Sequence, residues 1–107
     1  MSEIIPVRGV VYRADLGHGL KPFLAVSNNA RNKFLTSCLA VRITTTQKQE
    51  MASIVPLSTA DAPLVGFVLC DDIAELYRDE IKDQVGALST GTMLKVATGL
   101  KAALALL

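Results

Sequence analysis

Three polar residues interrupt stretches that are otherwise apolar: Lys21, Arg42 and Thr44. Lys21 directly precedes Pro22, and a proline disfavours helical backbone for the residue before it, so Lys21 should lie extended at the start of a strand. Alternate side chains of a strand share a face, which would place Arg42 and Thr44 about 6.6 Å apart. Two donors at that spacing could share one phosphate. A solvated loop lysine and a solvent-facing strand edge would produce the same pattern.

Two further features could carry proton chemistry. His18 lies between Gly17 and Gly19, and histidine is the side chain that changes charge between pH 5 and 8. An exposed loop histidine without a role is the commoner situation. Asp71 and Asp72 follow an apolar run, but adjacent residues of an extended chain point to opposite sides. They are therefore not expected to form a paired acid–base site, and one of them should cap the next turn.

The length and composition limit the class of protein. The chain has 107 residues, which is the length of a single domain over residues 1–107, and half of them are hydrophobic. It is too apolar for a disordered tail. Eleven Lys and Arg against ten Asp and Glu give a formal net charge of +1. Global charge therefore does not favour a nucleic-acid partner, and any anion site must be local.

The sequence also argues against several locations and cofactors. No apolar run reaches the ~18 residues needed to span a membrane, and no basic region followed by an apolar one marks a secretory signal. We therefore expect a cytoplasmic protein. Cys38 and Cys70 lie far apart in apolar surroundings; one disulfide is possible, but two reduced core thiols suit that compartment better. With one histidine and no Cys-x-x-Cys pair, no metal site and no cofactor are expected.

Short strands separated by turns are predicted for the first two thirds of the chain. The expected strands cover residues 7–14, 23–26, 38–46, 50–57 and 66–70. A helical turn should lie near residues 30–33, and residues 75–82 should hold a short strand or helical turn. No segment between the strands is long enough for a crossover helix. The pattern therefore predicts an antiparallel meander or small barrel.

The last fifth of the chain has helical periodicity. Ser89 is a good N-cap, and the apolar residues that recur at helical spacing after it are Met93, Val96, Ala97, Leu100, Leu104 and Leu107. The sequence predicts a helix from Ser89 onward. Its apolar stripe could cover the core of the barrel or face a partner chain.

Several segments occur in an order that is typical of one protein family. Residues 8–16 read Arg-Gly-Val-Val-Tyr-Arg-Ala-Asp-Leu, and residues 21–32 begin with Lys-Pro before an apolar strand and a Ser-Asn-Asn turn. Ala-Val-Arg-Ile-Thr-Thr follows at 40–45, Leu-Cys-Asp-Asp-Ile at 69–73 and Gly-Ala-Leu-Ser at 86–89. This ordered set resembles the MazF/PemK toxin endoribonucleases over residues 8–105.

The resemblance implies a mainly β fold with some α structure, an SH3-like small antiparallel β-barrel with a C-terminal helix packed on it. It implies a homodimeric toxin of a type II toxin–antitoxin system. Such a toxin cleaves single-stranded RNA (mRNA, tRNA or rRNA) without a metal, by attack of a 2′-OH on the adjacent phosphate. A cognate antitoxin would neutralise it by occupying the RNA groove.

The resemblance also assigns roles to individual residues. The family's catalytic Arg falls on Lys21 and its catalytic Thr on Thr44, so the chain resembles a Lys-bearing subgroup. A loop His and an Asp implicated in the Kid branch would fall on His18 and Asp71. Arg grips a phosphate bidentately, whereas Lys is a point charge. Further candidates for RNA contact are Asn28, Asn29, Arg31, Arg42 and Thr45.

A binding protein that uses the same barrel without cleaving RNA is the competing hypothesis. The CcdB gyrase poisons act through a tail that contains Trp, and this chain has no Trp. A degenerate, non-catalytic toxin is the stronger rival, because Lys21 stands where the family has Arg.

Overall fold

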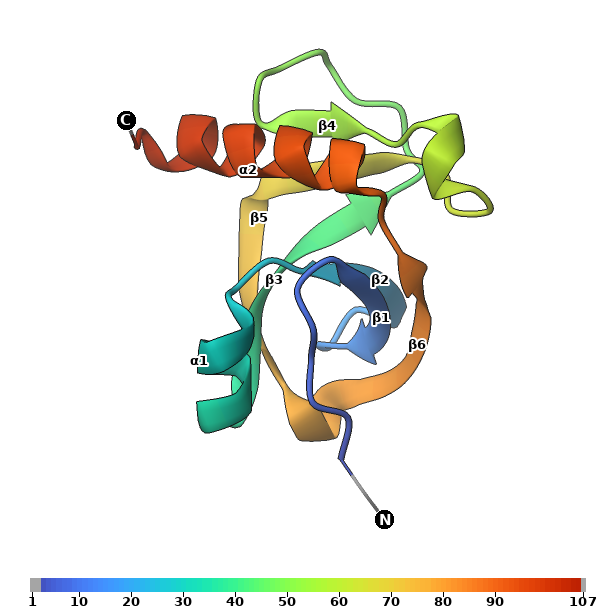
Figure 1. Ribbon diagram of the computed structural model, residues 1–107. Coiled ribbons are helices and arrows are strands. Elements are labelled where there is room, and N and C mark those ends of the chain that lie inside the picture. The colour runs from blue at the N-terminus through green and yellow to red at the C-terminus, as the bar shows by residue number, and fades with distance from the viewer. Residues whose placement is uncertain (1–2, 107) are drawn as a thin grey trace.

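Six antiparallel strands form one sheet in the order β4–β5–β3–β2–β1–β6. The computed structural model describes residues 3–106. Its strands are β1 (Val10–Asp15), β2 (Leu20–Ala25), β3 (Ser37–Thr44), β4 (Ile54–Pro56), β5 (Phe67–Tyr77) and β6 (Ile81–Ala87), and its helices are α1 (Asn29–Phe34), α2 (Thr90–Leu104) and the short 3₁₀ helices η1 (Thr59–Asp61) and η2 (Arg78–Glu80). The sheet coils into a small barrel, and α2 lies across β4 and β5 (Figure 1). The expected antiparallel barrel with a C-terminal helix is confirmed.

Both faces of the central strands are buried. Along β2, Leu24 belongs to the hydrophobic cluster beneath α2, whereas its neighbours Phe23 and Ala25 belong to the cluster inside the barrel. Successive side chains of a strand point to opposite faces, so each face needs its own apolar cover. This explains why these strands appear in the sequence as continuous apolar runs and not as alternating ones.

The turn predicted at Asp71 and Asp72 is absent, because β5 continues through both residues to Tyr77. The pairing with β3 is irregular there: Val41 pairs with Ile73, but the next residue, Arg42, pairs with Leu69. Residues 70–72 therefore form a bulge, which bends a strand and frees its residues from the ladder. Both aspartates are exposed at this bend.

Two other expectations differ from the structure at the edges of the sheet. Only the second half of the predicted strand at 50–57 pairs with β5, as β4. Residues 75–82 hold the end of β5, η2 and the start of β6. β6 is a half-exposed edge strand with several polar residues, so it lacks a clear hydrophobic pattern. The helical turn expected near 30–33 is confirmed as α1.

The predicted C-terminal helix is confirmed, and its apolar stripe mainly covers the core. The Ser89 hydroxyl caps α2 by accepting a hydrogen bond from the Thr92 backbone N–H at 3.2 Å. Val96 is fully buried, and Met93 and Leu100 pack on the same cluster. Leu104 is exposed, and Leu107 lies outside the described residues. Within residues 3–106, no helix combines the length and apolarity that crossing a membrane requires.

A buried carboxylate, Asp61, joins η1 to the start of α2. Its Oδ1 accepts a hydrogen bond from the Ser89 backbone N–H at 2.8 Å. Its Oδ2 accepts from the Thr92 hydroxyl at 2.6 Å and from the Ser58 backbone N–H at 2.8 Å. Burial alone would raise the pKa of this carboxyl, but these hydrogen bonds outweigh it and hold the pKa of Asp61 well below its usual value. The charged form therefore stabilises the fold.

Both cysteines are free thiols, as expected from the sequence. Cys38 lies in the cluster inside the barrel, and Cys70 lies in the cluster beneath α2. Each side chain is fully buried. Burial raises the pKa of each thiol to about 11.

Candidate functional site

The pairing of β2 with β3 brings Lys21 and Thr44 together. Phe23 pairs with Arg42, and the next two pairs keep the same antiparallel register. Lys21 and Thr44 lie two residues from the Phe23–Arg42 pair on their own strands, just past the end of the β2–β3 ladder. The two residues are 23 positions apart in the sequence, yet they lie side by side at the ends of neighbouring strands.

Lys21 and Thr44 line one cleft of about 380 Å³, here called the β2–β3 cleft. Its lining residues are Val11, Leu20, Lys21, Pro22, Arg42, Ile43, Thr44, Thr45, Thr46, Leu64 and Val65. Two of them are cations, three are consecutive threonines, and none is Asp, Glu or His. A concave surface with two cations, several hydroxyl donors and no carboxylate is suited to an anion such as a phosphodiester.

Thr44 is held by its own turn and by a glycine from the opposite side. Its Oγ1 accepts a hydrogen bond from the Thr46 backbone N–H at 3.2 Å, which leaves the hydroxyl hydrogen available for donation. Gly66 has φ +122°, and a Cβ on it would lie 2.3 Å from the Thr44 carbonyl oxygen. Only glycine permits this approach. Sequence reasoning missed Gly66, although a glycine at the start of a strand often marks close backbone contact.

His18 lies at the exposed tip of the loop between β1 and β2 and is not among the residues lining the cleft. The Asp15 carboxylate accepts hydrogen bonds from the backbone N–H groups of Gly17 at 2.8 Å and Gly19 at 3.1 Å. Both glycines have positive φ. The loop is therefore a defined turn that ends directly before Leu20 and Lys21.

Asp71 lies apart from Lys21 and Thr44. It lines a separate depression beside the last turn of α2, together with residues 51–53, Ala102 and Ala103. The bulge in β5 produces this placement, because it turns residues 70–72 out of the ladder with β3. Across the described part of the chain, no three His, Cys, Asp or Glu side chains are grouped so that they could hold a metal ion.

Asn28, Asn29 and Arg31, three of the residues predicted to contact RNA, lie near the start of β3, at the other end of that strand from Thr44. The Asn28 side chain caps α1 by accepting from the Arg31 backbone N–H at 2.8 Å, and the Asn29 side chain accepts from the Arg8 backbone N–H at 2.8 Å. The Arg31 guanidinium donates to the Ser37 carbonyl at 2.8 Å. Ser37 begins β3 and Thr44 ends it, about 23 Å apart at ~3.3 Å per residue. The side chains of Asn28, Asn29 and Arg31 therefore make hydrogen bonds within the fold. Arg42 and Thr45 line the β2–β3 cleft.

The sequence comparison settles the family. A family model described as the PemK-like, MazF-like toxin of type II toxin–antitoxin systems matches residues 7–104. The chain belongs to this family. Among curated relatives of the MazF-like toxin, endoribonuclease MazF4 of Mycobacterium tuberculosis and endoribonuclease MazF1 of Mycobacterium bovis are each 46% identical to it over 101 residues. Those residues make up 94% of this chain and 94% of each relative.

Solved structures agree with this assignment of the MazF-like toxin. A mycobacterial endoribonuclease in complex with its cognate antitoxin superposes with a TM-score of 0.90 at 46% identity, covering 95% of this chain and 97% of that one. Another mycobacterial endoribonuclease gives 0.89 at 42% identity, with coverage of 99% and 97%. MazF in a MazE–MazF crystal structure from Deinococcus radiodurans, at 21% identity and a TM-score of 0.83, shares the fold. The MazF/PemK resemblance is confirmed, and the gyrase-poison alternative is not favoured.

Proposed function

We propose that this MazF-like toxin is an endoribonuclease that cleaves single-stranded RNA in the β2–β3 cleft without a metal ion. The observation that carries the proposal is that Lys21 and Thr44 line one cleft together with another cation and further hydroxyls but no carboxylate. Relatives that share 46% of its residues and nearly its full length are endoribonucleases, which supports the same activity here.

In the proposed reaction, a ribose 2′-oxygen attacks the adjacent phosphorus and the bond from phosphorus to the 5′-oxygen breaks. The 2′-OH gives up its proton, the leaving 5′-oxygen gains one, and the products are a 2′,3′-cyclic phosphate and a 5′-OH. Because the nucleophile belongs to the RNA, the protein supplies in-line geometry, proton transfer and charge stabilisation. Single-stranded DNA lacks the 2′-OH and would not be cut.

The cleft residues divide these tasks. The Lys21 ammonium, with three donors, stabilises the phosphate and gives the leaving 5′-oxygen its proton. The Thr44 hydroxyl donates to a phosphate oxygen. His18 is the proposed proton acceptor for the 2′-OH, because its loop leads directly into Lys21 and could bring the imidazole over bound RNA. Asp71 lines a different depression and is left out of this set.

The proposed partners and location extend the same function. A cognate antitoxin would block the toxin by covering the β2–β3 cleft; a structural relative that is 46% identical has been solved in complex with its own cognate antitoxin. Two buried free thiols suit a reducing compartment, and RNA is the proposed substrate. The toxin is therefore proposed to act in the cytoplasm.

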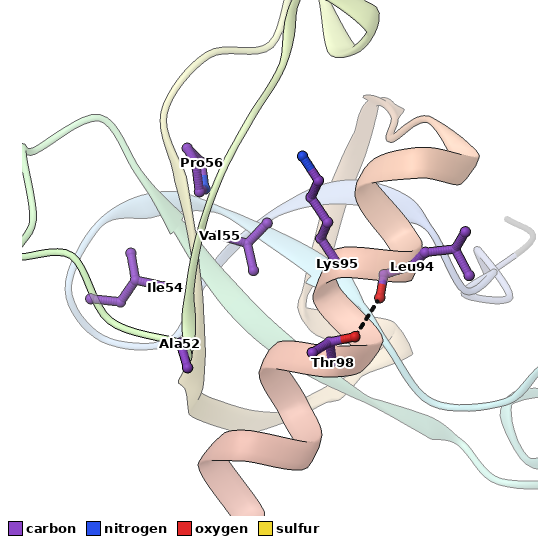
Figure 2. A pocket seen from close by; sticks show the side chains of 7 residues that line it. All are labelled: Ala52, Ile54, Val55, Pro56, Leu94, Lys95 and Thr98. Atoms are coloured by element: carbon purple, nitrogen blue, oxygen red, sulfur yellow. Dashed lines mark hydrogen bonds between the residues drawn. The ribbon is translucent and has the colours of Figure 1, made fainter.

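We also propose that two copies of the chain pair through the apolar groove between β4 and α2. Figure 2 shows this β4–α2 groove, about 420 Å³ in volume and lined by Ala52, Ile54, Val55, Pro56, Leu94, Lys95 and Thr98. The Leu94 side chain is 67% exposed, and β4 is an edge strand of the sheet. An open edge beside exposed leucine would be covered in a symmetric pair.

Light scattering at micromolar concentration should report about twice the chain mass of 11.4 kDa. Leu94→Glu should give a monomer, because each interface would then bury a carboxylate against apolar side chains. Leu35→Glu is the matched control: Leu35 is also exposed but lies beside α1, away from the groove. A monomeric parent protein, or a Leu94→Glu variant that stays dimeric, would contradict this interface.

The function itself is tested by cleavage in EDTA. The purified chain is incubated with a long single-stranded RNA, and with single-stranded DNA of the same sequence as a control. We expect RNA fragments that end in a 2′,3′-cyclic phosphate and begin with a 5′-OH, and intact DNA. If EDTA abolishes cleavage, the metal-independent mechanism is wrong. If several unrelated RNAs stay intact with and without EDTA, the non-catalytic toxin is the better interpretation.

A further inference from the structure

Arg42 differs from the other arginines of the chain in having no hydrogen-bond acceptor among residues 3–106. The chain has five arginines. The other four side chains donate to protein oxygens: Arg8 to the Val26 carbonyl, Arg13 to the Asp83 carboxylate, Arg31 to the Ser37 carbonyl, and Arg78 to the Asn32 and Leu35 carbonyls. The Nε–H groups of Arg42 and Arg78 are both buried without a partner, but only the Arg42 guanidinium also lacks an acceptor for its other N–H groups among residues 3–106. A buried donor without an acceptor is rare in folded proteins and calls for an explanation.

The Arg42 guanidinium is held in place without being neutralised. Its central carbon lies 5.9 Å from the centroid of the Phe23 ring, directly across the β2–β3 ladder. Phe23 is itself buried, so the ring is a fixed support. Contact with an aromatic ring attracts the cation but occupies none of its N–H groups. The guanidinium therefore keeps its planar set of donors for a ligand.

The position of Arg42 points to the nature of that ligand. The pair Phe23–Arg42 lies two residues along β2 from Lys21 and two residues along β3 from Thr44. Residues two apart on a strand share a face at a spacing of about 6.6 Å, and Arg42 lines the same cleft. Since no residue of that lining is Asp or Glu, the cleft brings two cations together without a counter-charge. An anion that bridges them would relieve this repulsion.

We infer that Arg42 is the bidentate phosphate ligand of the β2–β3 cleft and a catalytic residue of the proposed cleavage. The inference rests on the proposed function. It assigns bidentate binding of the phosphate to Arg42 and not to Lys21. The guanidinium fork binds the two non-bridging oxygens of the scissile phosphate, where negative charge grows during attack. Lys21, a point charge on a flexible stem, is then free to face the leaving 5′-oxygen.

Single-turnover cleavage of an RNA oligonucleotide measures the catalytic part. Arg42→Ala should slow cleavage about 100-fold or more, the scale of losing one preorganised charge donor. Arg42→Lys keeps the charge and most of the stem but removes the fork, and it should recover only part of the rate. Arg13→Ala is the matched control, since it removes an exposed arginine whose partner is Asp83, and it should cleave at the parent rate. Circular dichroism checks that each variant is folded.

Binding of inorganic phosphate to the intact parent protein gives an independent measurement. In an NMR titration, the Arg42 Nε–H signal should shift with phosphate while the Arg13 signal does not, and Arg42→Ala should bind phosphate at least tenfold more weakly. Cleavage by folded Arg42→Ala at the parent rate would overturn the inference and leave the proposed function standing. An Arg42 Nε–H signal that does not shift when phosphate is added would also overturn the inference. A parent protein that shifts Arg42 with phosphate yet cuts no RNA would support the ligand role and overturn the proposed function.

Discussion

Lys21→Ala should lower the single-turnover rate of RNA cleavage by about 100-fold or more. The reason is that Lys21 lines the β2–β3 cleft together with Thr44, where the proposed reaction needs a cation at the phosphate and no carboxylate competes for it. Removal of this charge leaves the leaving 5′-oxygen without its proton donor. Cleavage of a defined RNA oligonucleotide with enzyme in excess measures the chemical step directly.

Companion variants separate this role from general effects of charge. Lys33→Ala removes a lysine from α1, at the other end of β3, and should cleave at the parent rate. Lys21→Arg keeps a cation in the cleft but does not readily release a proton, so it should recover only the part of the rate that comes from charge stabilisation. Thr44→Ala should also slow cleavage, since a phosphate donor is lost. If folded Lys21→Ala and Thr44→Ala both cleave RNA like the parent, the site is wrongly assigned.

Asp61→Ala should lower the free energy of unfolding by about 3 kcal/mol, the scale of losing several hydrogen bonds to a buried carboxylate. The side chain joins η1 to the N-terminus of α2 through Ser89 and Thr92. Without the carboxylate these donors would stay buried and unpaired. Urea denaturation measures the change, and Asp79→Ala, an exposed aspartate in η2, is the control expected to cost less than 1 kcal/mol.

The same carboxylate gives this stabilisation a defined pH dependence. Because the folded-state pKa of Asp61 lies below the unfolded value near 3.9, its contribution is fully present above about pH 4. It is lost as the pH falls below that value. The difference in unfolding free energy between parent and Asp61→Ala should therefore be constant from pH 5 to 7 and shrink toward pH 2. A constant difference down to pH 2 would show that the ionised form of Asp61 is not what stabilises the fold.

Local features of the fold were predictable because their causes lie within a few residues. Ser89 followed by apolar residues at helical spacing predicts α2, and the structure begins that helix at Thr90. The helical turn expected near residues 30–33 is α1, and its cause is also local, because the Asn28 side chain caps it. The bulge in β5 and the edge strand β6 were missed, since both depend on pairing with distant strands. Neither leaves a periodic pattern in its own sequence.

The candidate site was predictable in its residues but not in its geometry. Lys21 and Thr44 stand out because a polar side chain interrupts an apolar run. Their meeting in one cleft depends on the pairing of β2 with β3, which no local pattern encodes. Residue type also does not show which polar side chains are already hydrogen-bonded within the fold. Arg31 and Arg42 look alike as RNA contacts in the sequence, yet Arg31 is bound to Ser37 and Arg42 is unpartnered among residues 3–106.

The two buried thiols are expected to be unreactive at neutral pH. At neutral pH a thiol with a pKa of about 11 is almost entirely protonated, and burial also keeps alkylating reagents away from Cys38 and Cys70. A cysteine introduced on the surface would then be the one site that a maleimide dye labels, with no need to remove the native thiols first. His18→Cys would carry such a dye at the tip of the β1–β2 loop; because it removes the proposed proton acceptor, it would report RNA binding without cleavage. The fluorescence of the dye would then show whether that loop moves onto bound RNA, as the proposed role of His18 requires.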